Sequence, residues 1–164
     1  SCPGLLGGQE WNGSAYSPPR VSLFKDINAQ SVANDAALAF GTTIGWDGEE
    51  YDDFGMHAAG TSANIVIPVT GLYYVSAKVW FTGNATGVRY IQCFNSTTST
   101  ILGYTRLLAT GGTANIDLFW SRDVQLAEGD VIQVKATQNS GVSLPLIIGD
   151  PSLCNFQARW VGQS

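Results

Sequence analysis

The sequence predicts an all-β domain, a sandwich or jelly roll of roughly nine or ten short strands. Three observations lead to this prediction. Runs of alternating apolar and polar residues recur along the chain, turn signals separate them every 8–12 residues, and no stretch has the spacing of an amphipathic helix. The clearest example is the pair of runs 124–126 and 131–137, joined by Glu128-Gly129-Asp130. An Asp and a Gly between two alternating runs indicate a tight β-hairpin.

The strands are expected in the following order. The first strand is the alternating run Arg20–Lys25, which follows Pro18-Pro19. Residues 26–35 are polar and predict a weak strand or a turn. Residues 36–46 could form a short helix or a strand, and their β-branched residues and glycines favour the strand. Residues 47–57 are expected to form an acidic loop. The other strands are expected at 64–68, 72–81, 88–95, 101–109, 114–126, 131–137 and 155–161.

Alternation within two of these strands predicts the core. Side chains two residues apart in a strand point to the same face of the sheet. The expected core faces therefore carry Ile132, Val134 and Ala136 in one strand, and Phe156, Ala158 and Trp160 in the last strand.

Composition narrows the classes of function. Only 13% of the residues are charged, about half of the usual share, and 45% are hydrophobic, which suits a protein that buries surface in an oligomer. The net charge of −5, with scattered basic residues, argues against nucleic acid as a partner. No apolar run approaches the length of about 20 residues that a membrane-spanning helix needs, so membrane insertion is not expected.

The chain divides into two segments. Residues 1–19 are rich in Gly, Pro and Ser and predict an N-terminal arm or connector, and residues 20–164 predict the jelly-roll domain. The three cysteines match no zinc pattern. Cys93 lies inside an apolar strand and is expected to pack as a small hydrophobic residue, whereas a disulfide between Cys2 and Cys154 stays open.

Three motifs, in this order, resemble the globular heads of complement C1q and of the tumour-necrosis-factor-like superfamily. Residues 68–76 (PVTGLYYVS) resemble a P-x-x-G-x-Y-x-x-S strand, residues 126–132 (LAEGDVI) resemble an L-x-x-G-D-x-V/I hairpin, and residues 140–144 (SGVSL) resemble an S-G-x-S-L loop. The resemblance covers residues 20–162. It implies a ten-stranded jelly roll that forms a compact homotrimer and binds its ligands on the exposed surface.

Further segments are similar to a branch of this superfamily in minor tail and fibre proteins of bacteriophages. They are residues 50–57 (EYDDFGMH), 73–80 (YYVSAKVW) and 84–89 (NATGVR). Segment 1–19 has no collagen-like Gly-X-Y period, in contrast to the animal proteins.

The acidic loop is a candidate metal site. Asp47, Glu49, Glu50, Asp52 and Asp53 place five carboxylates within seven residues, and calcium prefers such oxygen ligands. The spacing is not that of an EF-hand, so a solvated turn is the simpler interpretation, and no cofactor is expected apart from possible calcium. Sequence motifs predict no catalytic residue. His57, the single histidine, is expected to be structural.

Aromatic residues are the candidate interaction sites. Tyr74 and Trp80 share the face of their strand opposite the apolar residues, and we expect them at the trimer interface. Trp46 and Tyr51, expected in loops, are candidates for binding a surface ligand such as a sugar.

Together these observations predict a non-enzymatic, structural or adhesive virion protein. It would be a trimeric knob of a tail, a fibre or a head decoration on the virion surface, anchored to other virion proteins by segment 1–19, with a host glycan as a possible ligand. The first alternative is a secreted, extracellular C1q-like recognition or lectin-like domain. The second is a jelly-roll carbohydrate-active enzyme, because two carboxylates need only meet in space.

Overall fold

The computed structural model describes residues 17–39, 41–58 and 62–163. In these ranges the chain forms β-strands and connecting turns, and it contains no helix that could span a membrane. The strands are β1 (Arg20–Phe24), β2 (Ser31–Val32), β3 (Thr42–Thr43), β4 (Gly48–Asp52), β5 (Ile65–Val66), β6 (Gly71–Phe81), β7 (Val88–Asn95), β8 (Thr100–Leu108), β9 (Ile116–Leu126), β10 (Val131–Gln138), β11 (Leu144–Pro145) and β12 (Asn155–Gly162).

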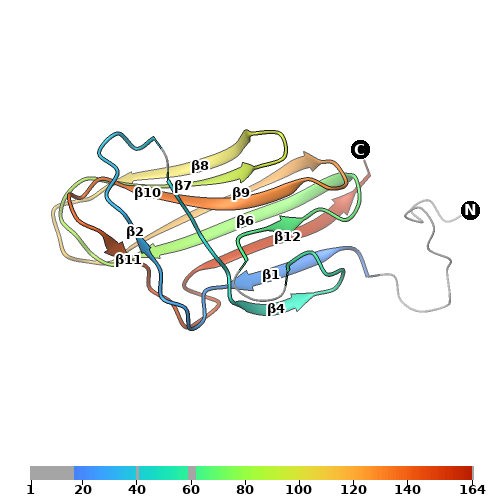
Figure 1. Cartoon of the computed structure of the whole chain (residues 1–164), viewed down its shortest axis with the longest axis horizontal. Helices are drawn as coiled ribbons and strands as arrows, with labels where there is room; N and C mark the ends of the chain where they lie inside the picture. Colours follow the sequence, from blue (N-terminus) through green and yellow to red (C-terminus); the bar gives the residue numbers. More distant parts are fainter. Residues whose placement is uncertain (1–16, 40, 59–61, 164) are drawn as a thin grey trace, which may run out of the picture.

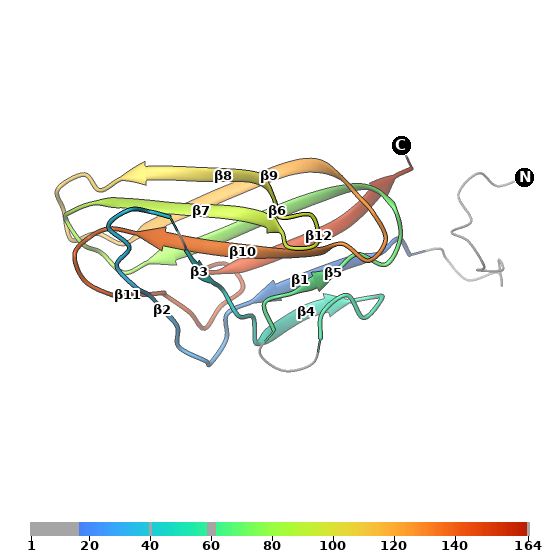
Figure 2. The same ribbon diagram turned by 45° about the horizontal axis from the view of Figure 1, so that its top comes forward.

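These strands form two antiparallel sheets that pack face to face (Figures 1 and 2). Sheet I has the order β4-β1-β12-β6-β9, and sheet II has the order β3-β10-β7-β8 with β5 also paired to β10. The short strands β11 and β2 pair with each other. Neighbours that are distant in sequence, such as β1 beside β12, give the crossed connections of a jelly roll.

Alternation along the strands builds the core between the sheets, as the sequence predicts. Ile132, Val134 and Ala136 of β10 are fully buried, and so are Phe156 and Ala158 of β12. Trp160 is only half-buried and packs at the margin of the core. Burial of apolar surface contributes about 25 cal/mol per Å². The inward side chains of β6 and β10 are buried along nearly the whole of each strand, so these two strands contribute much of the stability of the fold.

The long strands lie close to their predicted positions, whereas the segment 26–57 differs. Residues 36–46 contain only the two-residue strand β3, and β4 forms within the segment predicted as the acidic loop. This edge strand pairs with β1 through a bulge between Ser22 and Leu23. The expectation of a loop is wrong here because pairing with β1 overrides the weak strand preference of Glu and Asp.

The arm predicted at residues 1–19 is described only from Ser17 onward, where Ser17, Pro18 and Pro19 lead into β1 without regular structure. Cys2 lies outside the described residues, and so does any bond that it makes. Cys154 is a buried free thiol, and its Sγ accepts a hydrogen bond from the Trp80 backbone N–H at 3.3 Å. Cys93 is also buried and forms no disulfide, which fits the prediction that it packs as a small hydrophobic residue.

Candidate binding surfaces

The outer face of sheet I carries side chains in transverse rows, because directly paired residues of neighbouring strands point to the same face. One row consists of Arg20, Arg159, Tyr74 and Asp123. The next row consists of Ser22, Gln157, Ser76 and Ser121, and the third of Phe24, Asn155, Lys78 and Phe119. A row of mostly small polar side chains therefore lies between two rows with large ones; we call it the serine valley.

Hydrogen bonds hold the serine valley rigid. The Ser22 hydroxyl donates to the Glu50 carboxylate at 2.6 Å, and the Gln157 amide donates to the Ser22 hydroxyl at 3.0 Å. Ser22 and Ser76 are buried even though they point away from the core, because larger neighbours stand above them. At the other end of the row, Ser121 is exposed.

Stacked cations fix the two flanks of the valley. The Arg20 guanidinium lies 4.7 Å from the Tyr51 ring centre, and that of Arg159 lies 4.8 Å from the Tyr74 ring centre. On the other flank the Lys78 ammonium lies 5.4 Å from the ring of Trp80. The predicted interface residues Tyr74 and Trp80 therefore lie on one half-buried face, at opposite sides of the valley.

Beside this face, the edge strands β8 and β9 expose large apolar side chains. Leu107 and Leu108 are exposed on β8, and Phe119, the end of the third row of sheet I, is exposed on β9. Leu107 and Leu108 are adjacent, so their side chains leave opposite faces of β8. We call these three residues the edge surface. The two strands close the same side of the sandwich (Figure 2), and a hydrogen bond from the Thr105 hydroxyl to the Phe119 carbonyl at 2.7 Å connects them. A long apolar edge strand tends to associate with another chain, and monomeric proteins normally shorten, cover or charge such an edge.

The two predicted surface-ligand residues have different environments. Trp46 is fully buried, with its ring 5.8 Å from that of Phe156, so the prediction that it binds a surface ligand is wrong. Its burial follows from the path of the chain: β3 pairs with β10 of sheet II and β4 pairs with β1 of sheet I, so the segment between them passes from one sheet to the other. Tyr51 is half-buried on β4 beneath Arg20, and a ligand-binding role for it stays a prediction.

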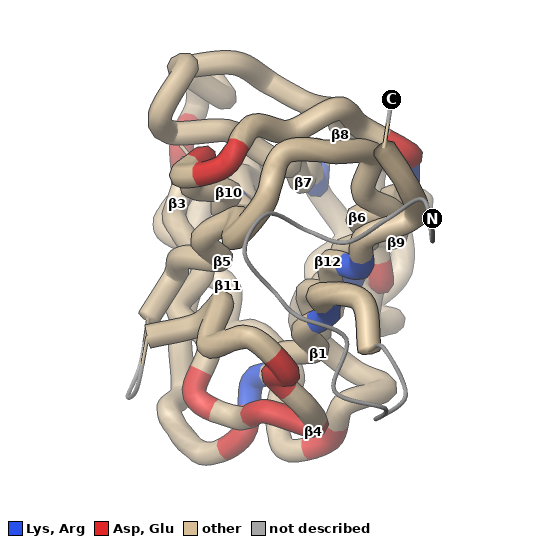
Figure 3. Tube along the Cα trace, turned by 90° about the vertical axis from the view of Figure 1, so that its right-hand side faces the viewer, with Lys and Arg blue, Asp and Glu red and all other residues tan. Residues whose placement is uncertain are grey.

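Each carboxylate of the acidic segment has its own structural partner. Asp47 accepts the backbone N–H groups of residues 26, 27 and 28, and Asp52 accepts those of residues 56 and 57. Glu49 pairs with His57 Nδ1 at 2.7 Å, Asp53 pairs with Arg20, and Glu50 accepts from Ser22. The acidic side of the molecule around β4 is visible in Figure 3.

The pairings separate the five carboxylates rather than gathering them. Over residues 17–39, 41–58 and 62–163, no three Asp, Glu, His or Cys side chains are placed to share a metal ion. The calcium hypothesis for this segment stays a prediction. The His57 Nε2 atom lies 3.2 Å from the Ser62 carbonyl, so both ring nitrogens make structural contacts.

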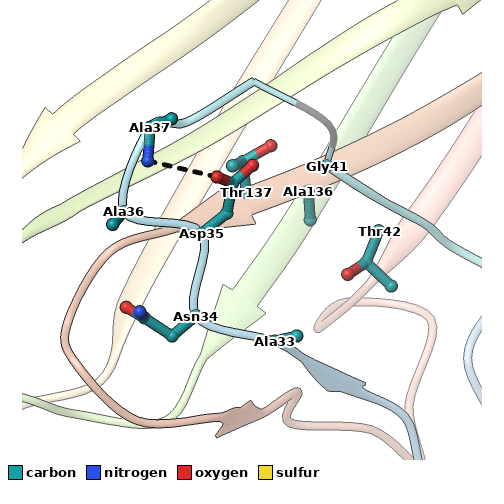
Figure 4. A pocket seen from close by; sticks show the side chains of 9 residues that line it. All are labelled: Ala33, Asn34, Asp35, Ala36, Ala37, Gly41, Thr42, Ala136 and Thr137. Carbon is teal, nitrogen blue, oxygen red and sulfur yellow. Dashed lines mark hydrogen bonds between the residues drawn. The ribbon is translucent and has the colours of Figure 1, made fainter.

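Two hollows lie over sheet II. The first, shown in Figure 4, is lined by small residues of the segment 33–42 and by Ala136 and Thr137 of β10. Asp35 turns back there to accept the N–H groups of Ala37 and Ala39, which fixes the turn. The second hollow is lined by Ala37, Leu38, Tyr90, Tyr104 and Arg106. Sequence reasoning did not single out this group, although the alternation of Tyr90, Gln92 and Phe94 in β7 places their side chains on one face.

Comparison with known proteins identifies the architecture. No family model and no curated protein sequence matches the chain. Among solved structures, murine APRIL at pH 5.0 is similar with a TM-score of 0.64 and 16% identity, covering 88% of this chain and 100% of that chain. The Eiger TNF of S. frugiperda has a TM-score of 0.61 and 11% identity, covering 90% of this chain and 96% of that chain. The globular domain of zebrafish complement 1qA has a TM-score of 0.55 and 10% identity, covering 89% and 99%. Likeness at these identities establishes the fold, and the chain is an all-β jelly roll of the C1q/TNF type.

Proposed function

We propose that the chain is a non-enzymatic recognition module that assembles into a homotrimer. The observation that carries this proposal is the pairing of two unlike surfaces on one molecule. The edge surface of β8 and β9 exposes large apolar side chains, whereas the outer face of sheet I has the serine valley, a row of mostly small polar residues, between aromatic flanks.

Contact between two unlike surfaces of identical chains is heterologous, and it forms a ring when the rotation closes. The C1q/TNF-like fold supports a ring of three. Leu107, Leu108 and Phe119 are 44%, 65% and 52% exposed, so burying the rest of each would contribute about half of the roughly 1.5–3 kcal/mol of a fully exposed side chain. Three such contacts per ring would favour assembly. Tyr74 and Trp80 flank the valley and would receive the edge of the neighbouring chain.

The setting that we propose for this trimer is a bacteriophage virion, as a knob of a tail, a fibre or a head decoration. Its support is the similarity of the segments 50–57, 73–80 and 84–89 to phage C1q-like domains. Three identical binding surfaces on one particle would convert weak individual contacts into high avidity. Segment 1–19 would join the knob to other virion proteins.

The native mass tests the assembly. We expect light scattering to give the mass of three chains over a hundredfold range of concentration, in calcium and in chelator alike. Leu107→Glu places a charge in the proposed contact and should shift the mass towards that of one chain. Val142→Glu introduces the same charge at an exposed loop position away from β8 and β9 and should leave the trimer intact.

A wild-type protein that is monomeric throughout the range would refute the trimer. Equal masses for Leu107→Glu and Val142→Glu would show that the edge surface is not the contact. Dissociation of the wild-type trimer in chelator alone would show that the assembly depends on a metal ion, and the carboxylates of β4 would then be the residues to substitute.

A further inference from the structure

The outer face of sheet II carries an ordered group of aromatic and cationic side chains that the trimer contact does not use. Strand pairing places them in two rows: Lys135, Gln92 and Tyr104 in one, and Thr137, Tyr90 and Arg106 in the other. Three adjacent strands, β10, β7 and β8, contribute one residue to each row. We call this group the tyrosine platform.

The two tyrosines form an aromatic surface. Their ring centres lie 5.4 Å apart at an interplanar angle of 54°, and the Tyr90 hydroxyl donates to the Gln92 side chain at 3.1 Å. Tyr104 is 61% exposed, so one ring face is open to a ligand. Aromatic faces of this kind have an apolar body for the C–H side of a flat ligand and a polar rim for its hydroxyl groups.

The neighbouring turn gives this surface a wall. Leu38 and Ala37 line the hollow over Tyr90, Tyr104 and Arg106. Leu38 has a positive φ of 54°, which is costly for a residue other than glycine, and the Leu38 N–H donates to the Asp35 carbonyl at 3.0 Å. The Asp35 carboxylate also accepts the N–H groups of Ala37 and Ala39. The wall is therefore held in place before any ligand binds.

The strands of this face carry only positive charges, although the whole chain carries −5. The adjoining turn contributes one carboxylate, that of Asp35, which accepts the N–H groups of Ala37 and Ala39. The strands β3, β5, β7, β8 and β10 contain no Asp or Glu, and their cations are Arg89, Arg106 and Lys135. Arg89 is buried and its guanidinium donates to the carbonyls of Asn84 and Thr86, so it is occupied. Arg106 is exposed, and it makes no salt bridge within residues 17–39, 41–58 and 62–163.

Geometry and charge together point to an anionic carbohydrate. Lys135 and Arg106 lie two strands apart and in neighbouring rows, so roughly 12 Å separates their backbone positions. The Lys135 ammonium already lies 4.0 Å from the ring centre of Phe94, which leaves Arg106 as the cation for an acidic group. A sugar ring stacked on Tyr104 would place its acidic substituent beside Arg106 and its hydroxyl groups beside Gln92.

We infer that the tyrosine platform binds an acidic oligosaccharide, with Tyr104 as the stacking residue and Arg106 as the partner of the carboxylate or sulfate group. This inference deepens the proposed function, because it gives the recognition module a ligand class. The platform and the serine valley lie on the outer faces of different sheets. Leu107 and Leu108 of the edge surface follow Arg106 directly in β8, so the neighbouring chain would approach the margin of the platform.

Titration calorimetry on the full chain tests the inference. The probes are a tetrasaccharide of alternating glucuronate and N-acetylglucosamine, its carboxyl-reduced counterpart, and a sulfated tetrasaccharide from heparin. We expect at least one acidic probe to bind and the carboxyl-reduced probe to bind at least tenfold more weakly. The comparison between glucuronate and sulfate probes identifies which acidic group Arg106 prefers.

Four variants locate the site. Arg106→Gln and Tyr104→Ala should each weaken binding at least tenfold, whereas Tyr104→Phe keeps the ring and should stay within threefold of the wild type. Arg122→Gln removes the same charge from β9 of the other sheet and should bind like the wild type. A thermal melt of each variant shows that it is folded.

Several outcomes would overturn the inference. Absence of binding to both acidic probes would overturn it, and so would equal binding of the acidic and the carboxyl-reduced probes. Equal effects of Arg106→Gln and Arg122→Gln would show that the site is not at Arg106. A glutamate-rich peptide is a fourth probe, and if it binds more tightly than any sugar, the ligand is not a carbohydrate. The native mass of each sample is measured alongside. A monomer that binds sugar would refute the trimer alone, and a trimer that binds none would refute the platform alone.

Discussion

The Asp47 carboxylate holds the turn that follows β1, and we expect it to stabilise the folded state. It accepts three backbone N–H groups, from Asp26 at 2.9 Å, Ile27 at 2.9 Å and Asn28 at 2.7 Å. It also lies 3.6 Å from the ammonium of Lys25, and only 2% of the Lys25 side chain and 4% of the Asp47 side chain are exposed. Asp47 thus fixes the turn after β1 and neutralises a buried cation.

The substitution Asp47→Asn keeps the size of this side chain and removes its charge. Breaking a buried ion pair leaves an uncompensated charge and costs about 3–5 kcal/mol. For a chain of 164 residues, this loss corresponds to a fall in Tm of roughly 10 °C. Urea and thermal denaturation at one fixed protein concentration measure the change, and Glu128→Gln, at an exposed position in the turn between β9 and β10, is the control.

The pH dependence gives the same prediction a second test. Burial alone raises the pKa of Asp47, but the hydrogen bonds from Asn28, Asp26 and Ile27, together with Lys25, bring it below the ordinary value. A lowered pKa stabilises the folded state at pH values above the ordinary pKa of about 3.9, and this stabilisation is lost as the pH falls through the folded-state pKa. The difference between wild type and Asp47→Asn should therefore be full at pH 7 and shrink below about pH 4. If Asp47→Asn loses no more stability at pH 7 than Glu128→Gln does, the reasoning is refuted.

Two further predictions concern the interior. A Cβ atom at Gly103 of β8 would lie 2.1 Å from Nε1 of Trp120, so Gly103→Ala should cost about 1–3 kcal/mol in urea denaturation. Gly112→Ala, where only one backbone atom lies within 4 Å at 3.9 Å, is the matched control, and equal effects would contradict the close approach. Burial raises the pKa of the Cys93 thiol to about 12 and that of Cys154 to about 11, so neither is a reactive thiolate at pH 8. A Cys2→Ser chain should react with a thiol reagent at pH 8 only after unfolding in urea, and rapid labelling of the native protein would show that these two sites open.

Alternation of side chains made most of the fold predictable from the sequence. In the long strands β6, β10 and β12, apolar residues recur at every second position over most of the strand, and a face so patterned must pack against another sheet. The core residues Ile132, Val134 and Phe156 could therefore be named in advance. The segment 26–57 could not be assigned in this way, because its strands are short and β4 exists only through its pairing with β1.

The positions of the binding surfaces could not be predicted from local sequence patterns, because they depend on which strands pair with one another. The sequence by itself determined that Tyr74 and Trp80 point away from the apolar side of their strand, and that the chain carries few charges. Only the tertiary structure decided that Trp46 is in the core, because the segment between β3 and β4 passes from sheet II to sheet I. Tertiary structure likewise set Tyr90, Tyr104 and Arg106 side by side, since register between β7 and β8 joins residues up to sixteen positions apart. Long-range strand pairing is the physical reason: it fixes which side chains meet, whereas the local sequence fixes only the face on which each one lies.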